Sequence, residues 1–296
     1  MVNKNMLNIL ILFFLLSCQS KKIITCAETI TPVPTPIEKT GWWLFWHDEF
    51  DENYLNTAYW TPENIKWPYN GEEEYYTPRP ENLHFENGCL VITALKEEYN
   101  GAHYTSARIH TEGKIKSAYG YVEARIKCSF GQGMWPAFWL FMPNCIFPSY
   151  YGEIDIFEMI GGGPNRDNKV YGTCHFGDGA QIISRGGSTL IPWPEKLADD
   201  FHIYAIEWDS TTIKWYFDGN EYFSVDITQA DQEELRTEQY VILNLAVGGT
   251  WPGSPDSTTI FPQHMYVDWV RWWKKNSEYF FVKKTFNIFY NTKSLS

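Results

Sequence analysis

The decisive stretch reads Glu153-Ile154-Asp155-Ile156-Phe157-Glu158, with three carboxylic acids set among apolar residues. Acids that alternate with apolar side chains are typical of a strand that packs one face on a core and turns the other toward a polar space. Like charges on one strand face repel each other, and their burial costs additional free energy. Neighbouring carboxyl groups with separated pKa values suit general acid–base and nucleophilic catalysis. We therefore interpret the cluster as catalytic, against the alternatives of a solvated strand face or a metal site.

The spacing of the three acids predicts a local irregularity in this strand. Side chains alternate along a strand, so Glu153 and Asp155 share a face, whereas Glu158 would point the other way. A β-bulge near Phe157 would return Glu158 to the acidic face, and bulges are common beside active sites. Carboxyl groups about 5 Å apart would suit a retaining glycosidase, and a gap of about 8 Å would suit an inverting one.

The rest of the chain predicts an all-β fold. Short alternating runs bounded by Gly, Pro, Asn and Asp extend over 41–275, and Asp218-Gly219 is a hairpin turn signal. Only short helices are expected, near 194–200 and 228–236. This pattern predicts a β-sandwich or jelly roll. The net charge of −12 without a basic stripe argues against nucleic acid as a partner, while the 14 Trp residues suit either sugar stacking or a sandwich core.

The first 40 residues indicate export. The apolar run from Leu7 to Leu16 is too short for a membrane span and ends just before Cys18. It resembles a bacterial lipoprotein signal, which implies a signal peptide over 1–17 and a lipid on Cys18 that anchors the protein to the cell envelope. Ordinary secretion is the alternative. Alternating prolines then predict an extended tether over 18–40.

The other cysteines show no CxxC pair and no metal-ligand spacing. Cys89, Cys128 and Cys174 lie in strand-like runs, and we interpret them as small buried side chains. A Cys89–Cys128 or Cys128–Cys174 bridge does not follow from the sequence. The stretch 276–296 continues the strand pattern poorly, and its role stays open.

The segment Gly152-Glu153-Ile154-Asp155-Ile156-Phe157-Glu158 resembles the signature of glycoside hydrolase family sixteen in its bulged form. Further segments resemble the laminarinase (endo-β-1,3-glucanase) branch of that family, in family order, at 46–50, 106–109, 119–125, 133–140, 243–249 and 265–271. The resemblance covers 41–275 and implies one catalytic domain. It implies a concanavalin A-like jelly-roll sandwich of two curved antiparallel sheets, with an open substrate cleft on the concave face.

The resemblance also implies roles for the three acids. Glu153 matches the nucleophile that forms a covalent glycosyl-enzyme, and Glu158 matches the acid that protonates the departing oxygen and then activates water. Asp155 matches the helper between them. A carboxyl group that shares a proton with Glu153 can adjust the charge of the nucleophile during the cycle. No cofactor is expected for this chemistry.

Several side chains match family positions that contact sugar. Trp135 and Trp139 share a strand face by their spacing and suit a sugar platform, although either can instead pack in the core. The remaining matches are Asn82, Arg108, His175 and Trp251. The alternatives are a turn cap for Asn82, a surface charge for Arg108 and a structural role for His175.

A structural calcium site is also implied on the convex side. It matches Glu49, Gly88 and Asp268, with Glu49 contributing its backbone oxygen, and calcium prefers such mixed oxygen ligands. Two ordinary surface acids are the alternative.

The expected function is retaining endo-hydrolysis of β-1,3-glucan of the laminarin type by a monomer. The same machinery acting on mixed-linkage glucan, agarose or a related galactan is the first alternative. The segments at 135–140 and 243–249 favour glucan, and no cluster of Arg and Lys favours a sulfated polymer. A non-catalytic glycan-binding protein is the alternative from another class, and the presence of all three acids argues against it.

Overall fold

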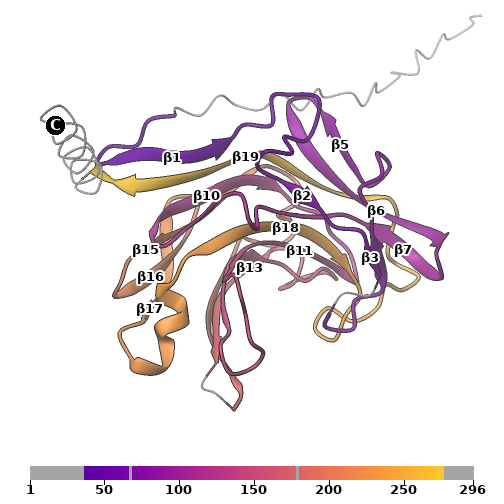
Figure 1. Cartoon of the computed structure of the whole chain (residues 1–296). Coiled ribbons are helices and arrows are strands. Elements are labelled where there is room, and N and C mark those ends of the chain that lie inside the picture. Colours follow the sequence, from indigo (N-terminus) through magenta and orange to yellow (C-terminus); the bar gives the residue numbers. More distant parts are fainter. Residues whose placement is uncertain (1–36, 67–68, 178–179, 277–296) are drawn as a thin grey trace, which may run out of the picture. The chain divides into compact units, whose positions relative to one another are not determined.

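A computed structural model describes residues 37–66, 69–177 and 180–276 of the chain. The expected signal peptide, Cys18, most of the tether and the tail from 277 lie outside the described residues. The described residues form strands in two layers with almost no helix (Figure 1). They contain no helix with the length and hydrophobicity of a bilayer span.

Sheet A has 11 strands in the order β17-β16-β15-β10-β19-β6-β7-β4-β3, with β1 beside β19 and β5 beside β6. Its neighbours are antiparallel except for β4 and β7, which run parallel. The first strand begins at Trp42 and the last ends at Lys275. The strands are β1 (Trp42–Asp48), β3 (Ile65–Lys66), β4 (Glu74–Tyr76), β5 (Leu83–Glu86), β6 (Cys89–Tyr99), β7 (Ala102–Ser106), β10 (Gly120–Lys127), β15 (His202–Trp208), β16 (Thr212–Phe217), β17 (Asn220–Asp226) and β19 (Gln263–Lys275).

Sheet B has 8 strands in the order β14-β13-β12-β11-β18-β8-β2, with β9 beside β18. The acidic segment is β12, which lies between β11 and β13. The strands are β2 (Thr61–Pro62), β8 (Arg108–His110), β9 (Lys116–Ser117), β11 (Met134–Phe141), β12 (Gly152–Glu158), β13 (Lys169–Gly177), β14 (Ile182–Leu190) and β18 (Gln239–Val247).

The two sheets confirm the predicted all-β sandwich, and local turn chemistry accounts for much of its connectivity. Asp218 and Gly219 both have positive φ, at 46° and 78°, and join β16 to β17 as the expected hairpin. A short 3₁₀ helix, Ala230–Arg236, lies in the second predicted helical segment. The helix expected near 194–200 is wrong, because the segment forms separate turns. The Leu197 N–H donates to the Asp167 carbonyl and the Lys196 N–H donates to the Asp199 side chain, so both groups are bonded outside a helical ladder.

The core fills the space between the sheets with large side chains. Phe157 of β12 faces Tyr204 of β15 with ring centres 3.9 Å apart, and both are fully buried. Cys89, Cys128 and Cys174 are buried and free, so neither of the bridges considered above forms. This packing fixes the inner face of β12, and its other face is therefore held against a cleft.

Candidate active site

A cleft of about 1300 Å³ crosses sheet B. Side chains from β14, β13, β12, β11, β18, β8 and β2 line it, which is the order of those strands in the sheet. A groove that runs across so many strands suits a chain-like ligand better than a small compact one. Glu153, Asp155 and Glu158, which we call the acid triad, all line this cleft.

A β-bulge brings Glu158 to the cleft face, as the spacing predicted. On β11, Trp139 pairs with Asp155 and the preceding Phe138 pairs with Phe157, so Ile156 is the extra residue. The register of β13 shifts at the same place. Ile156 and Phe157 both enter the core, and the alternation resumes one residue out of phase.

The other sheet stabilises this bulge. The indole Nε1 of Trp215 in β16 donates a hydrogen bond of 2.8 Å to the carbonyl oxygen of Asp155. Gly172 of β13 leaves room for that indole, because a Cβ there would lie 2.3 Å from Trp215 Cδ1. A buried carbonyl at a bulge costs free energy without a donor, so Trp215 is part of the reason for the bulge.

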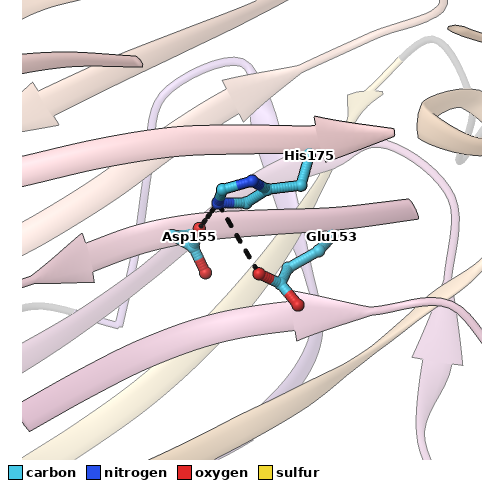
Figure 2. Close-up of side chains that lie close together, drawn as sticks. All are labelled: Glu153, Asp155 and His175. Carbon is cyan, nitrogen blue, oxygen red and sulfur yellow. Dashed lines mark ion pairs between the residues drawn. The ribbon is translucent and has the colours of Figure 1, made fainter. Parts of the chain in front are cut away.

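The carboxyl groups of Glu153 and Asp155 converge with the imidazole of His175 in the cleft (Figure 2). His175 Nε2 lies 3.1 Å from Asp155 Oδ2 and 3.7 Å from Glu153 Oε1. The other oxygen of Glu153, Oε2, accepts a hydrogen bond of 2.5 Å from the hydroxyl of Tyr151. Tyr151 and His175 thus engage different oxygens of Glu153.

Burial and mutual charge separate the proton affinities of these groups. Burial, and then the charge of Asp155, raise the pKa of Glu153 to about 7. The same two causes raise the pKa of Glu158 well above its ordinary value. Burial lowers the pKa of His175, but Asp155, Glu153 and Glu158 together outweigh burial and raise that pKa to about 9. Near neutral pH the site therefore combines a protonated Glu158 with a charged imidazole.

Tryptophans form one end of the cleft. Trp135 Nε1 donates a hydrogen bond of 2.8 Å to Glu158 Oε1, and the Trp135 ring meets the exposed ring of Trp251 edge to face. Gly249 has a φ of +116°, and a Cβ there would lie 3.1 Å from Trp135. Both indoles line the cleft, as expected of sugar-contacting side chains.

Trp139, four residues further along β11, lies beside Arg108 in the cleft. Trp139 Nε1 donates to Asn244 Oδ1 at 2.8 Å, and the guanidinium of Arg108 lies 5.0 Å from the centre of the Trp139 ring. Arg108 also forms an ion pair of 3.1 Å with Glu63. Arg108 is thus buried and ion-paired rather than an ordinary surface charge.

A second group of acids, which we call the inner carboxyl pair, lies at the wall of the same cleft. It consists of Glu72, which lines the cleft, and Glu74, which has no exposed surface. Glu74 Oε2 accepts the Val247 backbone N–H at 2.7 Å, and the hydroxyl of Tyr76 donates to Glu72 Oε2 at 3.0 Å. Glu74 Oε1 accepts no hydrogen bond from a backbone N–H or from another residue type. The carboxyl group of Glu72 lies within hydrogen-bond reach of the Glu74 carboxyl group. Burial raises the pKa of both carboxyl groups, which favours a proton held between them.

Asn82 is not in the cleft, and its expected sugar contact is wrong. The side chain has no exposed surface. Its amide nitrogen donates to the Thr93 carbonyl at 3.0 Å and to Thr105 at 2.9 Å, and its oxygen accepts from Thr77 at 2.6 Å. Through these hydrogen bonds, Asn82 joins a turn to two strands. No hydrogen-bonding group of its side chain is therefore left for a sugar.

The residues of the expected calcium site lie near one another. Val267 pairs with Leu90, which places Asp268 beside the turn that holds Gly88. The carboxylate of Asp268 lies 2.6 Å from Arg125, and the carboxylate of Glu49 lies 2.5 Å from Arg271. Because the Glu49 carboxylate forms an ion pair with Arg271, only the backbone oxygen of Glu49 is left to bind calcium, which is the ligand the resemblance implies. The calcium site stays a prediction.

Sequence reasoning missed several residues of the cleft. Tyr151 lies two positions before Glu153 and so on the same face, which is a signal that could have found it. Asn244 is a polar residue within an apolar run of β18, which is a second usable signal. Glu63, Tyr69 and Phe147 come from segments that reach the cleft only through the fold, and they carried no local signal.

Comparison with known proteins agrees with this geometry. The protein-family model described as "Glycosyl hydrolases family 16" matches residues 70–271 of the chain. The chain belongs to this family. It is a glycoside hydrolase, and the jelly-roll fold expected from the resemblance is confirmed. Beta-glucanase of Rhodothermus marinus is 37% identical over 253 residues, which is 78% of this chain and 84% of that protein.

Solved structures of the family are also similar. Endo-β-1,3-glucanase of Pyrococcus furiosus is 41% identical with a TM-score of 0.71, covering 82% of this family 16 hydrolase and 99% of that chain. A structure described with endo-acting O-glycanases that human gut microbes express to initiate mucin breakdown is 33% identical with a TM-score of 0.73, covering 82% and 94%.

The hydrolase spans only part of some longer relatives. Clotting factor G alpha subunit of Tachypleus tridentatus is 37% identical over 238 residues, which is 78% of this chain but 34% of that protein. The shared region is therefore one part of a larger polypeptide in that relative.

Proposed function

We propose that this protein is a retaining endo-glycosidase that hydrolyses β-1,3-glucan of the laminarin type. One observation carries the proposal. The bulge at Ile156 brings Glu158 to the cleft face that holds Glu153, so a glycosidic bond between them can be approached by two carboxyl groups. The β-glucanase relatives support glucan as the substrate class.

In the first step, Glu158 gives its proton to the departing glycosidic oxygen while a Glu153 oxygen bonds to the anomeric carbon. Trp135 donates to Glu158 Oε1, so the proton belongs on Oε2. Tyr151 holds Glu153 Oε2, which leaves Oε1 as the attacking atom. One C–O bond breaks and one forms, and the leaving sugar departs with the proton from Glu158.

In the second step, water replaces the ester. The charge of Glu153 disappears when the ester forms, so Glu158 loses one source of its raised pKa and can accept a proton from water. The resulting hydroxide bonds to the anomeric carbon and releases Glu153. Asp155, whose Oδ2 lies 3.1 Å from His175 Nε2, is the neighbouring carboxyl group that can exchange a proton with Glu153 during the cycle.

The charges that line the cleft favour a neutral polymer over a sulfated one. Among the described lining residues, the acidic side chains outnumber the cationic ones. Arg108 is paired with Glu63, and burial together with Arg108 lowers the pKa of His110 to about 4, so His110 is neutral. His175 is engaged by Asp155 and Glu153 of the acid triad. No described cation is left for a sulfate group, which favours glucan over a sulfated galactan.

A comparative digest tests this function. Laminarin, barley mixed-linkage glucan, agarose and mucin would be incubated separately with the protein, and products would be sized. We expect a ladder of short oligosaccharides from laminarin and no cleavage of agarose. Intact laminarin beside cleaved agarose or mucin would overturn the substrate. The Glu153→Gln variant is the control, because sugar release equal to wild type would reject the nucleophile.

The location of the protein remains a proposal on sequence grounds. We propose that it is exported and held at the cell envelope by a lipid on Cys18, and that it acts as a monomer. The Cys18→Ser variant should then move from the membrane fraction to the soluble fraction. An unchanged distribution would reject the anchor, and analytical ultracentrifugation checks the monomer.

We also propose a structural calcium ion at Glu49, Gly88 and Asp268. Its effect would be on stability and not on the reaction. Calcium should raise the melting temperature of wild type and not of Asp268→Asn, whereas equal shifts would reject the site.

A further inference from the structure

Three potential ligand atoms of the acid triad and its histidine surround a common space (Figure 2). They are Glu153 Oε1, Asp155 Oδ2 and His175 Nε2, and all lie within 4.8 Å of one another. Nε2 is only 3.1 Å from Oδ2, yet the direction of the ring N–H does not make this a hydrogen bond, and Oδ2 has no other donor. Asp155 is only 4% exposed, so water cannot freely supply one. A buried carboxylate oxygen thus lies without a hydrogen-bond donor beside the space between the three atoms.

The distances from His175 Nε2 to the two carboxylate oxygens suit a tetrahedral metal ion. Ligands 2.0–2.1 Å from Zn²⁺ at tetrahedral angles lie about 3.3 Å apart. The observed separations from Nε2, 3.1 Å and 3.7 Å, fall on either side of that value. Three protein ligands would leave the fourth position for water, open to the cleft.

The partners that orient metal ligands are also present. His175 Nδ1 lies 2.7 Å from the Ser184 hydroxyl, which fixes the ring with Nε2 toward the acids. The Tyr151 hydroxyl holds Glu153 through Oε2 and leaves Oε1 free. Metal sites depend on such outer hydrogen bonds, and they distinguish this cluster from acids that only happen to be close.

We propose that Zn²⁺, or a transition-metal ion of the same preference, binds Glu153, Asp155 and His175 and thereby inhibits the enzyme reversibly. Two carboxylates balance the charge of the ion, and the imidazole nitrogen favours Zn²⁺ over Ca²⁺, which prefers six to eight oxygens. On binding, Nε2 gives its proton to solvent and its lone pair to the metal. The nucleophilic oxygen of Glu153 is then engaged, so metal and substrate exclude each other.

Cobalt(II) tests the site without any measurement of activity. The full chain would be titrated with Co²⁺ and followed by the visible absorption of four-coordinate cobalt, and Zn²⁺ would then be added in competition. We expect one ion per chain, displaced by one equivalent of Zn²⁺. His175→Ala should weaken binding by roughly 100-fold or more, and Ser184→Ala by roughly tenfold, since outer partners alone are worth 10–100-fold.

Two control variants separate this site from other ligands. His103 forms an exposed pair of 2.6 Å with Glu98, so His103→Ala removes a similar pair elsewhere and should leave the absorption unchanged. Cys145 lines the same cleft, and Cys145→Ser should also leave it unchanged. The proposal is overturned if folded His175→Ala binds Co²⁺ as wild type does, if Ser184→Ala has no effect, or if Cys145→Ser abolishes binding. In the laminarin assay, which rests on the proposed function, Zn²⁺ should raise KM and leave kcat unchanged.

Discussion

Two groups of acids share one cleft but differ in what surrounds them. The acid triad has the imidazole of His175 on one side and hydrogen bonds from Tyr151 and Trp135 on single oxygens. The inner carboxyl pair, Glu72 and Glu74, has one hydroxyl, one backbone N–H and each other. Burial raises pKa values in both groups. A raised pKa therefore does not distinguish the two, whereas the oxygens left open toward the cleft do.

The two groups differ in what we expect to bind the carboxylate oxygens that have no hydrogen-bond donor. In the triad, each donor takes one oxygen and leaves the other for a substrate. In the inner pair, Glu74 Oε1 has no donor from any other group, so we expect a proton shared with Glu72 to satisfy it. We thus expect the triad to determine rate and the inner pair to determine stability, and the predictions below separate these two properties.

The largest expected effect is the loss of the acid. Glu158→Gln cannot donate a proton to the leaving oxygen, so laminarin hydrolysis should fall by about 10²–10⁴-fold. Glu74→Gln changes a buried acid of the same size and should stay within about threefold of wild type, the order expected when no contact to a reacting atom is lost. Initial rates of reducing-sugar release measure both, with circular dichroism to confirm folding. An equal loss in both variants would contradict the comparison.

A smaller effect should follow from removing one donor of the triad. Trp135→Phe keeps the ring but removes the 2.8 Å hydrogen bond to Glu158. Such a bond to an ionisable group is worth about 1.5–3 kcal/mol, so kcat should fall by roughly 10–100-fold. Trp139→Phe is the matched change, because its indole donates to Asn244 instead, and it should mainly raise KM. A larger loss of kcat in Trp139→Phe than in Trp135→Phe would argue against the role of the indole.

The smallest effect concerns the inner carboxyl pair and its dependence on pH. Burial raises the pKa of Glu74 well above its ordinary value of 4.5, in a setting shared with Glu72, Tyr76 and Arg108. The folded state holds this proton more tightly than the unfolded state. Its stabilisation is therefore complete below pH 4.5 and is lost as pH rises through the folded pKa.

The Glu74→Gln variant should not lose stability as pH rises, because the glutamine side chain does not titrate. Its amide oxygen can accept from Val247 and its NH₂ can donate to Glu72, whatever the pH. Glu74→Gln should gain about 1 kcal/mol over wild type at pH 8, or about 2–4 °C in melting temperature, and gain nothing near pH 4.5. Thermal melts at the two pH values measure the difference. A variant that is less stable at pH 8 would show that the pair does not share a proton.

The sequence predicted most of the triad because its signals are local. The alternation of acidic and apolar residues, and one extra residue between Asp155 and Glu158, were enough to predict the strand, its bulge and the shared face. Trp135, Trp139 and His175 followed from their spacing or from the family resemblance, and all three line the cleft.

The inner carboxyl pair had no such signal. Glu72 and Glu74 lie in a run of acids that resembles a solvated surface. They are buried because β4 pairs in parallel with β7 and because Glu72 bridges to Gly248 from the far end of the chain. The predicted sugar contact of Asn82 was wrong because the sequence does not show whether a polar side chain near a turn faces a cleft or the interior. Contacts between distant segments decided both cases.

The most direct test of the central claim is to trap the covalent intermediate. The protein would be incubated with a laminarin disaccharide that carries fluorine at carbon 2 and a good leaving group, then digested and examined by mass spectrometry. A single sugar ester on Glu153 is the predicted result. An ester on Asp155 or Glu158, or turnover that releases the opposite anomer without any ester, would contradict the account.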